Sequence, residues 1–339
     1  MKKYLYLIVI LVFASCNSKK YREMYQYSGY AQGTTFTITY DTNAGDLQAE
    51  IDQIISDFDK SMSLWDTSSH IYHINNTLNE VHADQYFTDV YELSEKIHLE
   101  TNGAFNPCVY PLIKYWGFAK DRFHPDSIAA KKINVDSLLK YSRWGMIAKT
   151  GENTYQRKHH RAGIDFNAIA QGYTVDVVAR LFDSKNVENY MIEIGGEVTA
   201  KGVNQHGKVW RIGIDKPISD STTRVLQAIV EIDNLSIATS GSYRKFYDKD
   251  GRRYSHTIDP RTGMPVEHRL LSASVITKGC AKADAYATAF MVMGAPKTVE
   301  FVNKHPEIMV YLISDGFNGE YEVYMSPALQ EKIKNPSDK

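Results

Sequence analysis

Residues 34–62, TTFTITYDTNAGDLQAEIDQIISDFDKSM, switch from one hydrophobic period to another and so decide the class of fold. Polar and apolar side chains alternate from Thr34 to Tyr40, which predicts a strand with one buried face. From Asp46 to Met62 the apolar residues recur three and four positions apart, which predicts an amphipathic helix. Strands and helices are therefore both expected to contribute to the core.

The rest of the chain continues this mixture without a repeating strand–helix–strand order. Further helices are predicted at about residues 84–100, 168–182 and 283–293. Strands are predicted at 190–194, 210–214, 225–232, 235–238 and 272–277, with a closing hairpin from 309–313 and 321–324. This order favours an α+β fold over a doubly wound parallel sheet.

Composition and missing motifs narrow the function classes. Apolar residues make up 43% and charged residues 23% of the 339, as in ordinary globular proteins. The 39 basic and 40 acidic residues leave no excess of positive charge for a nucleic-acid backbone, so we expect no nucleic-acid partner. The chain also lacks the phosphate-loop motif and the motifs GxGxxG, HExxH and GxSxG, which argues against the commonest nucleotide, zinc-protease and serine-hydrolase sites.

The N-terminus is typical of an exported lipoprotein. Two lysines precede the ten apolar residues 4–13, which are too few to cross a bilayer but suit a signal peptide. Two small residues come directly before Cys16, as at a bacterial lipoprotein cleavage site. We therefore expect a signal peptide within residues 1–16 that is cleaved before Cys16, lipid on Cys16, a tether over 17–29, and a position on the periplasmic side of a bacterial membrane. The alternatives, a plain secretory signal or an uncleaved anchor, also predict export.

The two other cysteines, Cys108 and Cys280, lie far apart in the sequence. Neither belongs to a CxxC pair, which argues against a zinc site or thioredoxin-like chemistry. We expect both side chains to serve in packing, and one disulfide between them stays possible.

The segment richest in reactive side chains is 239–266, TSGSYRKFYDKDGRRYSHTIDPRTGMPV. Within it, His256 follows a strand-like run and precedes the rigid turn that begins at Asp259. A histidine held in this way is well placed for proton transfer. A histidine that only caps a surface hairpin is an equal alternative.

Two further segments carry acids in apolar surroundings. Asp284 and Thr288 lie one helical turn apart on one face of a predicted helix, and their oxygens suit Mg²⁺. Asp165 precedes a helix of small residues, whose first N–H groups could face phosphate and whose carbonyls could bind a cation. The structural alternatives are an aspartate that hydrogen-bonds its own helix and an ordinary N-capped helix.

Two aromatic segments could form walls for a planar ligand. Residues 101–118, TNGAFNPCVYPLIKYWGF, interleave aromatic side chains with Gly and Pro, and Trp65 follows the helix that ends at Met62. A structural corner and ordinary core packing explain these features equally well.

Taken in this order and at this spacing, the segments resemble the FAD:protein FMN transferase family, the ApbE flavin transferases. The resemblance covers about residues 30–295. The matching segments are Gly33-Thr34-Thr35-Phe36, the helix end at Met62-Ser63, 101–118, 164–176 (IDFNAIAQGYTVD), 190–202 (YMIEIGGEVTAKG), 239–266 and 283–294 (ADAYATAFMVMG).

The resemblance implies a T-fold-like α+β architecture in one domain over residues 30–335, with two lobes around a flavin cleft. It implies an enzyme that binds FAD and Mg²⁺, cleaves the pyrophosphate, attaches FMN through a phosphoester to a Thr of a target protein, and releases AMP. The expected target is an electron-transfer subunit at the membrane. Hydrolysis of FAD to FMN and AMP, and a non-catalytic flavin-binding lipoprotein, stay open as alternatives.

Residue by residue, the resemblance implies three groups of site residues. The proton acceptor falls on His256. The metal ligands fall on Asp284, Thr288 and the backbone carbonyl of Ala168. The FAD contacts fall on Gln32, Trp65, Ala104, Phe105, Asn106, Asp165, Gln171 and Ile258.

Overall fold

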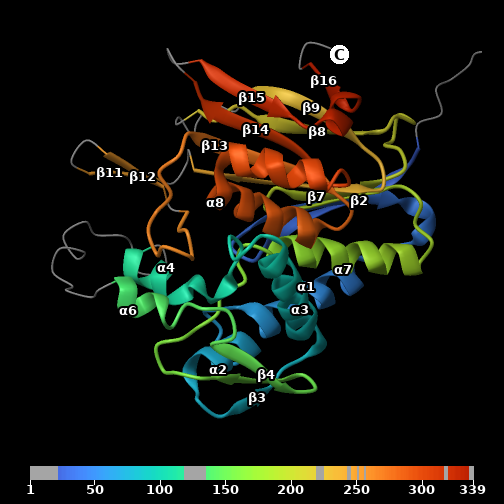
Figure 1. Cartoon of the computed structure of the whole chain (residues 1–339). Coiled ribbons are helices and arrows are strands. Elements are labelled where there is room, and N and C mark those ends of the chain that lie inside the picture. Colours follow the sequence, from blue (N-terminus) through green and yellow to red (C-terminus); the bar gives the residue numbers. More distant parts are fainter. Residues whose placement is uncertain are drawn as a thin grey trace, which may run out of the picture.

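The computed structural model describes residues 22–117, 135–218, 225–242, 246–249, 252–255, 257–316 and 320–335. At its centre lies an eight-stranded sheet in which all neighbouring strands are antiparallel (Figure 1). In spatial order the strands are β1 (Met24–Ala31), β2 (Thr34–Asp41), β6 (Tyr190–Ile194), β7 (Glu197–Lys201), β10 (Leu235–Gly241), β13 (Leu270–Thr277), β14 (Met309–Asp315) and β15 (Tyr321–Met325).

The two faces of this sheet are covered differently (Figure 1). On one face, helices α7 (Ala170–Ser184) and α8 (Cys280–Lys304) pack on alternate strand residues such as Val275. On the other face, a core that includes Ile276 lies under a small sheet and a short helix. These elements are β8 (Trp210–Asp215), β9 (Leu226–Ile232), β16 (Ile333–Lys334) and α9 (Pro327–Gln330).

A lower lobe, residues 48–117 and 135–162, hangs from the helical face (Figure 1). It contains α1 (Gln48–Met62), α2 (His70–Asn76), β3 (Glu80–His82), α3 (Gln85–Glu100), η2 (Pro107–Val109), α4 (Tyr110–Trp116), α6 (Val135–Leu139), β4 (Ile147–Gly151) and β5 (Thr154–Arg157). Elsewhere, η1 (Thr42–Ala44) follows β2, and a separate hairpin is formed by β11 (Phe246–Lys249) and β12 (Arg252–Ser255).

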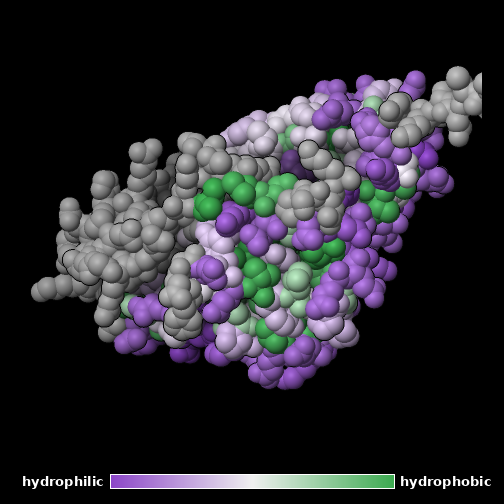
Figure 2. Space-filling model, turned by 90° about the horizontal axis from the view of Figure 1, so that it is seen from above, coloured by the Kyte–Doolittle hydropathy of each residue, from purple (hydrophilic) through white to green (hydrophobic). Residues whose placement is uncertain are grey.

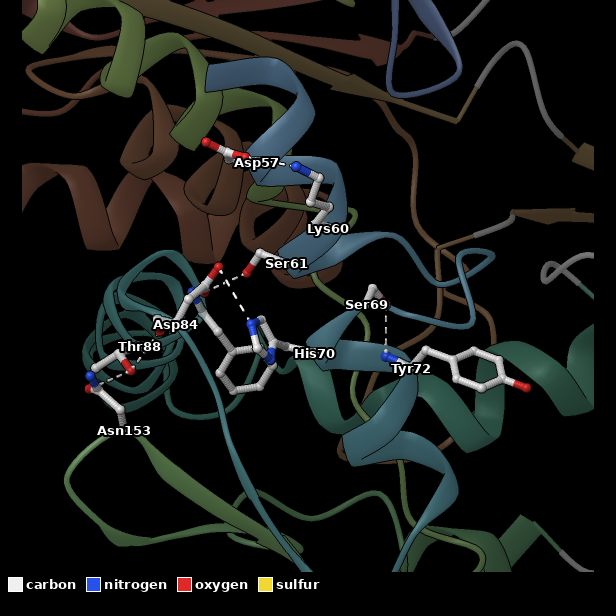
Figure 3. A network of polar contacts seen from close by, with 10 residues as sticks. Asp57, Lys60, Ser61, Ser69, His70, Tyr72, Asp84, Thr88 and Asn153 are labelled. Carbon is white, nitrogen blue, oxygen red and sulfur yellow. Dashed lines mark hydrogen bonds and ion pairs between the residues drawn. The ribbon is translucent and has the colours of Figure 1, made fainter. Parts of the chain in front are cut away.

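A polar network around Asp84 joins three elements of the lower lobe (Figure 3). Asp84 caps α3 by accepting a hydrogen bond from the backbone N–H of Phe87 at 2.9 Å. The same oxygen accepts from the fully buried hydroxyl of Ser61 on α1 at 2.7 Å, and the other lies 3.8 Å from Nε2 of His70 on α2. Because Ser61 donates to the carboxylate and not to His70, these residues form a structural junction rather than a nucleophile–base pair.

The α+β prediction is confirmed, and so are the elements on which it depended. The predicted strand is β2, with Phe36, Ile38 and Tyr40 buried on one face. The closing hairpin is formed by β14 and β15. The predicted end of the helix at residue 293 coincides with a kink, because Gly294 has φ +75°.

Two strands of the central sheet differ from the sequence-based expectation. Residues 24–29, assigned above to the tether, belong to β1, where only Ala31 is buried; an exposed edge strand lacks the alternation that would reveal it. Strand β7 was not predicted either, because its first four residues are all buried and its sequence therefore does not alternate. Cys108 and Cys280 are buried and unpaired, so the packing role is confirmed.

Seen from above, the molecule shows apolar residues in several patches separated by hydrophilic ones (Figure 2). Exposed apolar side chains include Val209, Leu226 of β9 and Val323 of β15. Among the described residues, no helix combines the length and the apolar character needed to cross a membrane. The predicted signal peptide lies outside the described residues.

Candidate functional site

A cavity of about 510 Å³ opens where the start of α7, the start of β7, the end of β10 and the first half of α8 meet. The rest of its wall comes from three further segments, represented by 104–107 with Val109 and Ile113, by Asp165 with Asn167, and by 257–258 with Pro260. Its size is that of an ordinary small-molecule site. Segments far apart in the sequence thus converge on one place.

Most of the predicted site residues lie in this cavity. The three predicted metal ligands, Asp284, Thr288 and Ala168, all line it. Six predicted FAD contacts also line it, namely Ala104, Phe105, Asn106, Asp165, Gln171 and Ile258.

Three predicted site residues are not among those that line the cavity. Gln32 lies beside α7, where its amide donates to the hydroxyl of Thr174 at 2.7 Å. Trp65 is 55% exposed between α1 and α2. His256 lies outside the described residues, although the next residue, Thr257, lines the cavity.

The chain around Asp165 fixes its carboxylate at the wall. Its backbone N–H donates to the carbonyl of Pro107 at 3.0 Å, and its Oδ1 accepts from the backbone N–H of Asn167 at 2.8 Å. Burial raises the pKa of Asp165 to about 6, although the bonds from Asn167 act in the opposite direction. Burial in the cavity wall therefore disfavours the charge on this acid.

Asn106 combines a place in the cavity wall with a structural role. Its side-chain oxygen accepts from the backbone N–H of Cys108 at 3.0 Å, and its amide donates to the carbonyl of Ser142 at 2.9 Å. Because both ends of the amide are engaged by the protein, Asn106 shapes the segment that carries Ala104 and Phe105.

A close approach of α7 and α8 places Asp284. A Cβ added to Gly172 would lie 2.5 Å from the carbonyl oxygen of Cys280, so only glycine fits at this crossing. The approach brings the N–H of Gly172 to 3.4 Å from Oδ2 of Asp284. Burial raises the pKa of Asp284 to about 7.

The hydrogen bond of Gly172 also leaves a carbonyl free. In a regular helix this N–H would donate to the carbonyl of Ala168, four residues earlier. Here it donates to Asp284, and no hydrogen bond recorded among the described residues uses the carbonyl oxygen of Ala168. The hydroxyl of Thr288 lies 3.2 Å from that of Ser240.

Glu197, which the sequence reasoning did not single out as a site residue, also lines the cavity. It follows the turn of Gly195 and Gly196, both of which have positive φ, and begins β7. Burial, followed by the charge of Asp284, raises the pKa of Glu197 well above its ordinary value. The sequence signal that could have revealed Glu197 is its position directly after two glycines, at the start of a buried strand.

The donors around the cavity fit a hard divalent cation. Three carboxylates line it, from Asp165, Glu197 and Asp284, whereas none of the described lining residues is Lys, Arg or His. Carboxylate, hydroxyl and carbonyl oxygens are the ligands that Mg²⁺ prefers. No group of three His, Cys, Asp or Glu side chains within the described ranges could by itself enclose a metal ion. A cation here therefore needs hydroxyl, backbone or substrate oxygens as well.

Comparison with known proteins gives one consistent result. The model of the ApbE family matches residues 32–312. Among curated relatives, the FAD:protein FMN transferase of Vibrio cholerae is 37% identical over 320 residues, covering 91% of this chain and 93% of the relative. The enzyme of the same name from Haemophilus influenzae is 32% identical, covering 91% of each chain.

Solved structures agree with these relatives. The flavin transferase ApbE from Vibrio cholerae superposes with a TM-score of 0.81 at 32% identity, covering 92% of this chain and 99% of the other. The apo form of the Pseudomonas stutzeri flavinyl transferase ApbE has a TM-score of 0.80 at 26% identity, covering 92% and 97%. A histidine-to-glycine variant of the Vibrio cholerae protein has a TM-score of 0.79.

Proposed function

This chain belongs to the ApbE family, and from that premise we propose that it is a Mg²⁺-dependent FAD:protein FMN transferase with a threonine acceptor. Transfer of FMN from FAD to a protein is the activity named for the relatives, and it is the activity of this chain. The cation, the threonine and the roles of single residues are our own assignments.

The acidic lining of the cavity is the observation that carries the cation assignment. FAD brings an anionic pyrophosphate, yet three carboxylates and no described basic side chain line the cavity. Carboxylates and a pyrophosphate placed in the same cavity repel one another strongly where water is excluded. Asp284, Thr288 and the carbonyl of Ala168 supply the oxygens that would hold Mg²⁺. When bound, Mg²⁺ neutralises charge on the pyrophosphate and on the departing AMP.

The remaining contacts orient FAD. The N–H groups of Ala170, Gly172 and Tyr173 at the start of α7 already have acceptors within the protein. That of Gln171 has none among the described residues, so it suits a phosphate oxygen. Phe105 and Ile258 supply apolar wall for the ring system. These contacts fix the attacked phosphorus relative to the acceptor protein.

His256 is assigned the proton transfer. As the threonine oxygen bonds to the FMN phosphorus and the bond to the AMP oxygen breaks, the imidazole takes the hydroxyl proton and AMP leaves with the bond's electron pair. General-base catalysis typically contributes about 10²–10⁴-fold. We therefore expect His256→Ala to lower the rate of FMN transfer by that order while FAD still binds, as measured by flavin fluorescence. An equal loss of binding in a folded variant would contradict the role.

The experiment for the whole function combines FAD, Mg²⁺ and a candidate acceptor domain. We expect AMP release and an acceptor whose mass increases by FMN on one threonine, and neither when EDTA is present. An acceptor with that threonine replaced by Ala is the control. Release of FMN and AMP without any modified protein would support FAD hydrolysis instead, and bound FAD with no AMP would support a storage protein.

We also propose that lipid on Cys16 anchors the enzyme to a bacterial membrane on the periplasmic side. Because β1 begins at Met24, the residues between them reach at most about 25 Å. That length would hold the enzyme close to an electron-transfer subunit in the same membrane. The test is membrane fractionation with labelled fatty acid: Cys16→Ala should lose both the label and the membrane association, and retention of both would refute the anchor.

A further inference from the structure

Glu197 is a buried acid that has no cationic partner in the part of the chain that the structure describes. The residue is 8% exposed, and its side chain lines the cavity that also contains Asp284. Its Oε2 is buried and has no hydrogen-bond partner in the part of the chain that the structure describes. A buried acid in this condition destabilises the fold.

The surroundings of Glu197 add negative charge and no positive charge. The groups recorded as acting on it are Asp284 and Glu193, which raise its pKa, and its own backbone N–H, which lowers it. No Lys, Arg or His among the described residues lines the cavity. Among the described residues, Glu197 therefore has no cationic partner.

We propose that Glu197 belongs to the cation site, where it supplies the second carboxylate for the divalent ion that Asp284 and Thr288 bind. This inference rests on the proposed function. Two carboxylates balance the charge of one divalent ion, and Mg²⁺ sites commonly use one or two carboxylates together with phosphate oxygens. A consequence is that the free enzyme binds the cation before FAD arrives.

The test measures the binding of Mn²⁺ to the mature full chain in the absence of FAD. Binding is detected as the loss of the free-ion signal in electron paramagnetic resonance. Wild-type protein should bind Mn²⁺, and Glu197→Gln should weaken the affinity by about 10-fold or more. Glu193→Gln is the matched control: Glu193 does not line the cavity, and its Oε1 accepts the N–H of Gly196, which Gln retains. Its affinity should change far less than that of Glu197→Gln, because only a more distant charge is removed.

A second measurement distinguishes a ligand from a merely structural acid. Without metal, Glu197→Gln should unfold at a higher temperature than wild type, because an unpaired buried charge is gone. Mg²⁺ should raise the Tm of the wild-type protein, and it should raise the Tm of Glu197→Gln by less. A structural carboxylate would give a lower Tm in both conditions.

Wild-type Mn²⁺ affinity in Glu197→Gln, or no binding by wild type without FAD, would overturn the inference. Neither result would touch the transferase activity, which is measured separately as FMN on the acceptor. Conversely, a wild-type protein that binds Mn²⁺ and modifies no acceptor would refute the proposed function alone.

Discussion

The network around Asp84 and the cavity around Asp284 differ in how well the protein hydrogen-bonds a carboxylate. In the lower lobe, Asp84 receives hydrogen bonds at 2.7 and 2.9 Å and has His70 at 3.8 Å (Figure 3). In the cavity, among the described residues, Asp284 receives the N–H of Gly172 at 3.4 Å, and Oε2 of Glu197 has no hydrogen-bond partner. Satisfied acids hold elements of a fold together, whereas unsatisfied buried acids indicate a missing ligand. Replacing Asp by Asn in the two regions should therefore have opposite effects on stability.

The largest expected effect is that of Asp284→Asn. Because a neutral amide is a poor cation ligand, FMN transfer at saturating FAD should fall by on the order of 10²–10³-fold. The metal-free protein should become more stable, since its buried acid has a pKa raised to about 7. AMP release and urea unfolding measure the two effects. Unchanged Mg²⁺-dependent turnover would remove Asp284 from the site.

Asp165→Asn should give the next largest effect. The pH dependence of its stability tests whether a buried acid of the cavity wall destabilises the fold when it is ionised. The pKa of Asp165 is raised from 3.8 to about 6, so the folded state binds its proton more tightly than the unfolded chain. The ionised group therefore destabilises the fold fully above pH 6 and not at all below about 4. The asparagine variant should gain as much as ~3 kcal/mol of unfolding free energy at pH 7. Urea unfolding at pH 8, 6 and 4 should show this gain disappear; a gain that is independent of pH would refute the cause.

The sequence predicted the parts of the site that depend on local spacing. Asp284 and Thr288 share a helix face whatever the rest of the fold does, and the segment from Asp165 to Gln171 forms a turn and a helix start. Each of these carries its chemistry within one element. Local pattern was therefore sufficient to single them out as candidates, whereas their assignment to one site came from the family resemblance.

The parts that depend on tertiary pairing could not be predicted in this way. Glu197 reaches the cavity because β7 pairs with both β6 and β10, which no local pattern reveals. The side chain of Gln32 donates a hydrogen bond to Thr174 of α7, and the sequence around Gln32 does not indicate that partner. Strand β1 is recognisable only from its pairing with β2, because its side chains are mostly exposed.

Gly172→Ala should have an intermediate effect, because it disturbs the cavity through the fold. The added Cβ would meet backbone atoms of Cys280 and Ala281 at 2.5–2.9 Å, which cannot rotate away. We expect a loss of about 1–3 kcal/mol in unfolding free energy and weaker Mn²⁺ binding, since α7 and α8 must separate. Gly151→Ala is the control, because its Cβ would meet only the side chain of Thr154, at 3.6 Å. Equal stability of the two variants would contradict the close approach.

Asp84→Asn should have the smallest effect. Its stability should fall, whereas that of the cavity variants Asp284→Asn and Asp165→Asn should rise. The asparagine oxygen can still accept from Ser61 and from the N–H of Phe87, so only the partly exposed pairing with His70 is lost. Such pairings contribute about 0–1 kcal/mol, so unfolding free energy should fall slightly, and FMN transfer and Mn²⁺ binding should stay within about twofold of wild type. A stability gain as large as that of Asp165→Asn would mean that hydrogen-bond satisfaction does not separate the two regions. A loss of Mn²⁺ binding would place the cation's influence well beyond the cavity, because Asp84 does not line it.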